Sequence, residues 1–319
     1  MTAHPLDDIT RSEGDRHPSQ LLTDRPAAYT TALGAAYAGD ARLVLAQLPT
    51  GSVNLVLTSP PYALHFKKEY GNAAKDDYIQ WFLPFAREIK RVLAPDGSFV
   101  LNIGGSYNAG TPTRSLYHFK LLIALCDEIG FQLAQEGFWF NPAKLPAPAE
   151  WCNVRRIRVK DSVEYVWWLS PSPWPKANNK RVLVPYSADM ERLIERGFRV
   201  KDRPSGWKHT EKFRRNHGGS IPGNLIERGN NESNSEYIKA CQKFGQKAHP
   251  ARFPAALPEF YIKLLTEPGD IILDPFAGSN TTGRVAEDLG RRWIGVELSA
   301  AYVQNSALRF GLAPVAMKL

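Results

Sequence analysis

Two strand-like apolar runs flank a helix-like segment in residues 53–105, and this order most constrains the fold. The runs are VNLVLTS (residues 53–59) and GSFVLNIGG (residues 97–105). Between them, apolar residues from Ile79 to Leu93 recur at helical spacing, and Pro95-Asp96-Gly97 supplies a stop signal. A strand, a helix and a second strand predict a right-handed crossover between parallel strands. The chain is therefore expected to be an α/β protein.

The remaining patterns predict a second α/β half after an irregular middle. We expect strands at residues 36–40, 131–140 and 161–170, the last two antiparallel, and a helix at residues 115–130. Residues 171–246 are dense in Pro, Gly, Asn, Ser, Arg and Lys, which predicts loops with little core. After them come an expected helix that starts at 257 and is ended by Pro268-Gly269, a strand at 271–276, a helix at 280–289, a strand at 292–297 and a helix at 300–310.

Positive charge is concentrated in the middle third of the chain. The net charge is +8, and residues 151–252 hold 21 Lys and Arg against 10 Asp and Glu. A polyanion docked there is one interpretation, and a solvated basic face is the other.

Several classes of protein do not fit the sequence. The three cysteines form no CxxC or Cys/His spacing, so we expect neither disulfides nor a metal site. No run approaches the roughly 20 apolar residues of a membrane span, and the N-terminus lacks the apolar core of a signal peptide. We expect a soluble, cytoplasmic protein with no membrane partner.

The segment LDPFAGSNTTG, residues 273–283, has the pattern of a strand, a tight turn and a helix start. Backbone N–H groups of such a turn can bind polar ligand ends. The GxGxxG fingerprint and the Walker A lysine are absent. Asp274 can accept hydrogen bonds from an ammonium group, and Glu297 ends the next strand, where an acid can bind ribose hydroxyls. S-adenosylmethionine fits both acids; the alternative is a structural turn with two solvated acids.

The segment TSPPY, residues 58–62, ends a strand with two prolines that cannot donate ladder hydrogen bonds. Ser59 and the carbonyl of Pro60 offer two acceptors, and Tyr62 offers a flat face. Together they suit a planar amino group that becomes positively charged as it attacks a methyl group. No Pro-Cys nucleophile is present, which argues against methylation at carbon 5 of cytosine. A proline-rich strand end that only shapes a loop is the alternative.

TSPPY followed by DPFAGSNTT resembles the β-class amino-methyltransferases of bacterial restriction-modification systems, from about residue 36 to residue 310. The resemblance implies a Rossmann-like S-adenosylmethionine-dependent fold with a seven-stranded mixed sheet and a basic target-recognition insert. It also implies that residues 249–260 close over the methionine end of the cofactor. The catalytic residues implied are Ser59, Pro60, Pro61 and Tyr62. The cofactor-binding residues implied are Asp40, Asp274, Pro275, Phe276, Ala277, Gly278, Ser279, Thr281 and Glu297.

The serine at position 59 bears on the target base. In this family N4-cytosine enzymes mostly carry Ser there, and N6-adenine enzymes mostly carry Asp or Asn. The resemblance therefore implies methylation of a flipped-out cytosine at N4, which protects host DNA from a cognate restriction enzyme. N6-adenine methylation stays open, as do an RNA substrate and, with the motif order against it, a protein glutamine.

Four segments are expected along the chain. Residues 1–28 are predicted to be a disordered extension, 29–170 the catalytic half, 171–247 the target-recognition region and 248–319 the cofactor-binding half. We expect the recognition region to grip phosphates and read bases of double-stranded DNA. The candidate DNA-binding residues are Arg203, Lys208, Lys212, Arg214, Arg215 and His217. The sequence leaves the recognised site open, and a monomer or weak dimer is expected.

Overall fold

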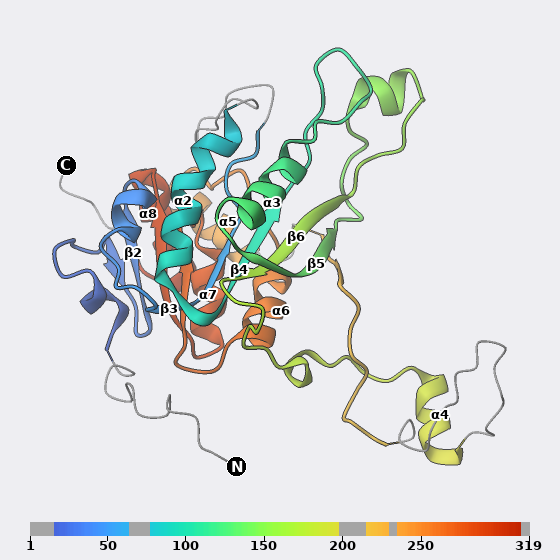
Figure 1. Ribbon diagram of the computed structural model, residues 1–319. Coiled ribbons are helices and arrows are strands. Elements are labelled where there is room, and N and C mark those ends of the chain that lie inside the picture. Colours follow the sequence, from blue (N-terminus) through green and yellow to red (C-terminus); the bar gives the residue numbers. More distant parts are fainter. Residues whose placement is uncertain (1–15, 64–76, 198–214, 230–234, 314–319) are drawn as a thin grey trace.

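A computed structural model describes residues 16–63, 77–197, 215–229 and 235–313, which form a sheet covered by helices on both faces (Figure 1). The strands are β1 (Tyr29–Thr30), β2 (Gly34–Ala38), β3 (Val53–Thr58), β4 (Leu93–Ile103), β5 (Gln132–Phe140), β6 (Val163–Ser170), β7 (Leu225–Glu227), β8 (Ile271–Asp274) and β9 (Arg292–Glu297). The α-helices are α1 (Ala41–Leu45), α2 (Tyr78–Val92), α3 (Tyr117–Asp127), α4 (Ala188–Arg196), α5 (Ser235–Lys243), α6 (Ala256–Leu265), α7 (Thr281–Asp288) and α8 (Ala300–Ser306).

The strands lie in the order β1-β2-β9-β8-β3-β4-β6-β5-β7. Neighbours from β2 to β4 are parallel, whereas β6 is antiparallel to both β4 and β5, as the sequence predicts for residues 131–140 and 161–170. The sheet of the described residues has nine strands, so the expected number of seven is wrong. The two additional strands are the short edge strands β1 and β7, which owe their conformation to pairing with β2 and β5.

Alternating side chains of the central strands pack into two hydrophobic cores, one on each face of the sheet. On β4, Phe99 and Leu101 pack with α1, α2 and α3, whereas Val100 points to the opposite face, toward α6, α7 and α8. On β3, Val56 joins the first core and Leu57 the second. Both faces of the parallel strands are therefore buried, which explains why these segments read as continuous apolar runs.

The N-terminal residues that the structure describes are ordered, in contrast to the prediction for residues 1–28. A short 3-10 helix (Pro18–Leu21) is followed by Leu22, which is 2% exposed and packs in the first core. The apolar contact of Leu22 with the sheet outweighs the polar composition around it. Residues 1–15 lie outside the described part of the chain.

The middle segment is more regular than its composition predicts. It includes α4, β7 and α5, and Figure 1 shows α4 well apart from the sheet. No side chain of α4 is buried. Helix α5 instead buries Tyr237 and Cys241 in a cluster with Leu308 of the C-terminal half. No helix of the described residues is long and apolar enough to cross a membrane.

Candidate active site

A cavity of about 940 Å³ lies where β2, β3, β8 and β9 end. Ser59 and the residues after it line one part, and the loop after β8 lines another. Segments following strand ends commonly form ligand sites in sheets of this kind, because neighbouring parallel strands end at one edge. The volume is that of a site for a small organic ligand. The structure thus brings together two motifs that are about 200 residues apart in sequence.

All four expected catalytic residues line this cavity: Ser59, Pro60, Pro61 and Tyr62. Tyr62 is held by a close approach to β4. A Cβ atom at Gly104, just after that strand, would lie 2.5 Å from a ring carbon of Tyr62. The Tyr62 ring can occupy this place only because residue 104 has no side chain.

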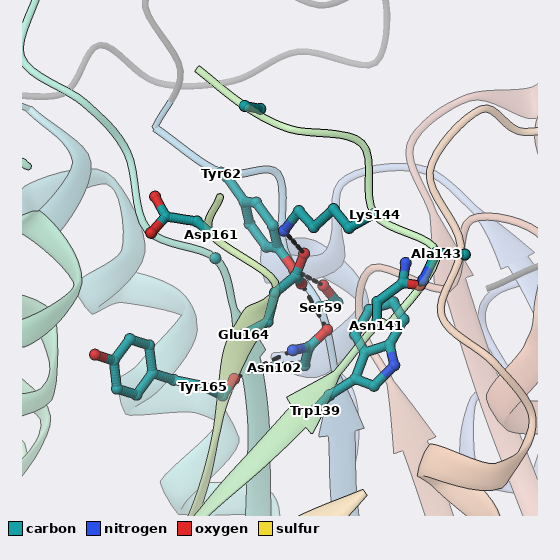
Figure 2. A network of polar contacts seen from close by, with 12 residues as sticks. Ser59, Tyr62, Asn102, Trp139, Asn141, Ala143, Lys144, Asp161, Glu164 and Tyr165 are labelled. Atoms are coloured by element: carbon teal, nitrogen blue, oxygen red, sulfur yellow. Dashed lines mark hydrogen bonds and ion pairs between the residues drawn. The ribbon is translucent and has the colours of Figure 1, made fainter. Parts of the chain in front are cut away.

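A chain of polar contacts runs from the cavity wall to Ser59 (Figure 2). The Tyr62 hydroxyl donates to Glu164 Oε2 at 2.7 Å and lies 3.2 Å from Ser59 Oγ. Glu164 Oε1 accepts from Lys144 Nζ at 3.0 Å. Burial and the neighbouring Glu164 carboxylate raise the pKa of Tyr62 well above its ordinary value. Tyr62 is therefore a neutral hydroxyl at neutral pH.

Asn102 and Trp139 complete the wall around the catalytic motif. Asn102, on β4, is 1% exposed, and its Oδ1 lies 3.3 Å from the Tyr62 hydroxyl. Trp139, on β5, donates from its indole nitrogen to the carbonyl of Arg228 at 2.8 Å. The Trp139 ring therefore forms an aromatic part of the cavity wall, and its indole N–H is already hydrogen-bonded within the protein.

Asp274 lies in a different place from the one expected. It is 2% exposed and is not among the residues that line the cavity. Its Oδ1 accepts from Thr58 Oγ1 at 2.6 Å and from the Phe276 backbone, and its Oδ2 accepts from Thr282 Oγ1 at 2.7 Å. Both oxygens are thus engaged within the protein. Burial raises the pKa of this carboxyl to about 6.

The loop that Asp274 supports supplies most of the expected cofactor residues. Those that line the cavity are Pro275, Phe276, Ala277, Gly278, Ser279 and Thr281. The Phe276 ring packs on Trp81 and Phe85 of α2, with ring centroids 5.9 and 5.0 Å away. Gly278 has φ +52°, and a Cβ there would lie 3.2 Å from the His249 ring. The turn therefore requires glycine on both counts.

Glu297 lies at the end of β9 and lines the same cavity. Its Oε2 accepts from the Gly278 N–H at 3.0 Å, and its Oε1 accepts from the Ser299 N–H at 2.9 Å. Burial raises the pKa of this carboxyl. Each oxygen keeps a further lone pair, so the acid can both brace the loop and accept from a ligand hydroxyl.

Asp40 also lines the cavity and is the N-cap residue of α1. Its carboxylate caps the helix through the Arg42 N–H at 2.9 Å and also pairs with the Arg42 guanidinium. These hydrogen bonds from Arg42 lower the pKa of Asp40. Asp40 is therefore ionised at neutral pH.

Residues 249–253 form the remaining wall. The His249 ring lies 4.5 Å from that of Tyr302, edge to face, and His249 Nδ1 contacts the Ala251 carbonyl at 2.6 Å. Burial lowers the pKa of His249 to about 4, so the ring is neutral. Arg252 contacts the His249 carbonyl and brings a positive charge to the cavity wall.

Of the candidate DNA-binding residues, Arg215 and His217 are exposed and do not line the cavity. The backbone N–H of His217 donates to the Tyr186 hydroxyl at 2.8 Å. Arg203, Lys208, Lys212 and Arg214 lie outside the described residues.

Sequence reasoning missed several residues of the cavity wall, namely Trp81, Asn102, Trp139, Lys144 and Glu164. Two of them carried a usable signal. Asn102 interrupts the apolar run FVLNIGG, and Glu164 is the one charged residue of β6. A polar side chain within a buried strand requires a partner, and here the partner is the catalytic motif.

Comparison with known proteins adds independent evidence. The family model described as DNA methylase (N6_N4_Mtase) matches residues 53–308. Type II methyltransferase M.PvuII of Proteus hauseri is 52% identical over 286 residues, covering 89% of this chain and 85% of that protein. The solved structure of PvuII DNA methyltransferase (cytosine-N4-specific) has a TM-score of 0.74 and 47% identity, and the match covers 90% of this chain and 89% of that one. TTHA0409 of Thermus thermophilus, solved in complex with S-adenosyl-L-methionine, has a TM-score of 0.52 and 25% identity, with coverage of 86% and 94%.

Proposed function

The chain belongs to the DNA methylase family of N6 and N4 methyltransferases, and from this premise we propose that it methylates cytosine at N4 in duplex DNA. The methyl donor is S-adenosylmethionine, and the biological role is protection of host DNA from a cognate restriction enzyme. The observation that carries the proposal is one cavity lined by Ser59–Tyr62 and by the loop from Pro275 to Thr281. The high identity to a cytosine-N4-specific enzyme supports the choice of base.

The cavity residues fit S-adenosylmethionine. Glu297 has free acceptor lone pairs for ribose hydroxyls, and Phe276 offers an aromatic face beside the loop. Asp274 contributes indirectly. Its carboxylate accepts hydrogen bonds from Thr58 and Thr282 and so holds the loop after β8 in place. The cofactor supplies a methyl group made electrophilic by its positively charged sulfur. The protein's task is to place an amine in line with that carbon.

Residues 58–62 then bind the target base and stabilise its amine during methyl transfer. The base leaves the helical stack, because a base inside the duplex cannot reach a cavity at the strand ends. Ser59 and the Pro60 carbonyl accept the hydrogens of the exocyclic amine, while Tyr62 contacts the ring. The amine attacks with its own lone pair, and both acceptors stabilise the positive charge that develops on nitrogen. As a monomer or weak dimer, the protein would methylate one strand at a time.

Mass spectrometry of nucleosides tests this function directly. Plasmid DNA is isolated from cells that express the protein, from cells that express Ser59→Ala, and from cells with an empty vector. N4-methylcytosine only with the wild-type protein is the expected result. N6-methyladenine would retain the cofactor and the fold but refute the role given to Ser59. Neither base, from protein that binds S-adenosylmethionine, would refute DNA as the substrate.

A further inference from the structure

The Tyr62 hydroxyl faces three polar atoms and has one proton to give (Figure 2). Glu164 Oε2 lies at 2.7 Å, Ser59 Oγ at 3.2 Å and Asn102 Oδ1 at 3.3 Å. A carboxylate only accepts hydrogen bonds, and a charged acceptor makes the shortest and strongest of them. The Tyr62 proton therefore lies on the contact with Glu164.

The orientation of Asn102 rules out a hydrogen bond donated by its side chain to the Tyr62 hydroxyl. Its Nδ2 donates to the Tyr165 carbonyl at 3.1 Å, so the side-chain oxygen faces Tyr62 and cannot donate to it. Of the three neighbours of the Tyr62 hydroxyl, only Ser59 carries a proton that it can direct there. With that proton engaged, the Ser59 lone pairs are left for the cavity.

Lys144 lies at the other end of this series of polar contacts, beyond Glu164. Its Nζ lies 3.0 Å from Glu164 Oε1, so the two carboxylate oxygens are divided between Lys144 and Tyr62. The side chain of Glu164 is 16% exposed and that of Lys144 is 33% exposed. The contacts with Lys144 and Tyr62 together fix the orientation of the carboxylate group.

We propose that Glu164 is a positioning residue that, through Tyr62, holds Ser59 as a hydrogen-bond acceptor for the target amine and receives the proton that the amine releases. This inference rests on the proposed function. An acceptor at Ser59 fits an amino group, which donates, and disfavours a carbonyl at the same ring position, which accepts. The acceptor at Ser59 therefore favours binding of cytosine over thymine and uracil.

The proton balance is complete within these residues. The amine lone pair forms the new C–N bond as the C–S bond breaks, and the electron pair of that bond stays on sulfur. The nitrogen becomes positive and passes a proton to Ser59 Oγ, the Ser59 proton moves to the Tyr62 oxygen, and the Tyr62 proton moves to Glu164. The product amine is neutral, and Glu164 is protonated beside Lys144.

Glu164→Gln tests the proposal in the full-length protein, because it keeps the shape of the side chain and removes the charge. Under single turnover, the methyl-transfer rate is expected to fall by about 10². The Kd for S-adenosylmethionine and for DNA is expected to stay within about twofold, because Glu164 acts on Ser59 through Tyr62 rather than by holding either ligand. Glu150→Gln is the matched control, since Glu150 pairs with Arg155 on the surface of the same β5–β6 connection. A Glu164→Gln rate equal to wild type would overturn the proposal.

A double-mutant cycle separates this role from a structural one. Tyr62→Phe keeps the ring and removes the hydroxyl through which Glu164 acts. Adding Glu164→Gln to Tyr62→Phe should then cause no further loss of rate. Full additivity of the two effects would refute the chain through Tyr62. Wild-type protein that makes no N4-methylcytosine would instead refute the proposed function.

Discussion

At the scale of single residues, Asp274 serves the site without lining it. The carboxylate bridges Thr58, which precedes Ser59, and Thr282, at the start of α7. One buried side chain thus ties the end of β3 to the loop after β8. The sequence marks this acid as functional, but only the contacts distinguish a ligand-binding residue from one that holds the loop.

Asp274→Asn is expected to change how stability depends on pH. The folded-state pKa of about 6 exceeds the ordinary value of 3.8, because burial disfavours the charged form. Between these values the folded protein holds a proton that the unfolded chain has lost, so this group lowers the free energy of unfolding as pH rises. Chemical denaturation of wild type and Asp274→Asn should show that the difference in their free energies of unfolding, wild type minus variant, falls by about 2 kcal/mol from pH 4 to pH 7. A constant difference across that range would contradict the argument.

Ser59→Ala is expected to lower the single-turnover methyl-transfer rate by about 10², because the amine loses an acceptor in the transition state. The affinity for S-adenosylmethionine, measured by calorimetry, should be unchanged. Ser52→Ala is the control: the Ser52 hydroxyl contacts the Pro49 carbonyl in the turn before β3. Weaker cofactor binding by Ser59→Ala would assign this serine to the cofactor instead.

At the scale of elements, prediction succeeds where apolar periodicity is strong. β3, α2, β4, the β5–β6 pair and the elements from α6 to α8 all lie close to the expected residues. β7 was not predicted, because its three residues carry no periodic signal. Its place depends on β5: the Phe138 N–H donates to the Asn224 carbonyl, and the Asn224 side chain donates to the Glu136 carbonyl.

In the candidate site, too, residues in a strong local sequence pattern could be predicted, and residues brought together only by the fold could not. The residues of TSPPY and of the β8 loop could be found from local pattern, because each motif is a strand end with turn chemistry. Lys144 could not be found in this way, and the single charge of β6 marks Glu164 without giving its partner. The contact of Glu164 with Tyr62 depends on how the β5–β6 pair lies against β4. Antiparallel register, which the sequence leaves open, decides that contact.

Gly104→Ala tests the junction of β4 with the catalytic motif. The new Cβ would lie 2.5 Å from the Tyr62 ring, so the ring must move away from Glu164 and Ser59. A loss of at least about tenfold in methyl-transfer rate is expected. Gly223→Ala is the control, because a Cβ there meets nothing within 4 Å. Equal rates in both variants would show that Tyr62 tolerates displacement.

At the scale of the whole molecule, the basic stretch and the two ligand-site motifs occupy different parts of the chain, although Glu164 and residues 249–252 of that stretch also line the cavity. The basic stretch spans residues 151–252, whereas the catalytic motif and the cofactor loop lie before and after it. The separation suits a protein that grips a backbone in one region and does chemistry on one base in another. Arg215 and His217, both exposed, lie within the basic stretch.

Arg214→Gln combined with Arg215→Gln is expected to weaken DNA binding and flatten its salt dependence. Each phosphate that these arginines no longer neutralise should reduce the slope of log K against log salt by about 0.9. Fluorescence anisotropy with a duplex at several salt concentrations measures this slope. Lys263→Gln with Arg284→Gln removes the same charge from α6 and α7 and should leave the slope closer to wild type. Equal slopes in both double variants would place the phosphate grip elsewhere.

The position of β8 and β9 between β2 and β3 bears on the order in which the protein matures. A ribosome delivers β2 and β3 early, yet the strands that separate them arrive more than 200 residues later. Until then, both early strands present open edges that invite pairing with other chains. Nascent protein ending before Ile271 should therefore lack activity and depend on chaperones. Methylating capacity would arise in a single late step of synthesis.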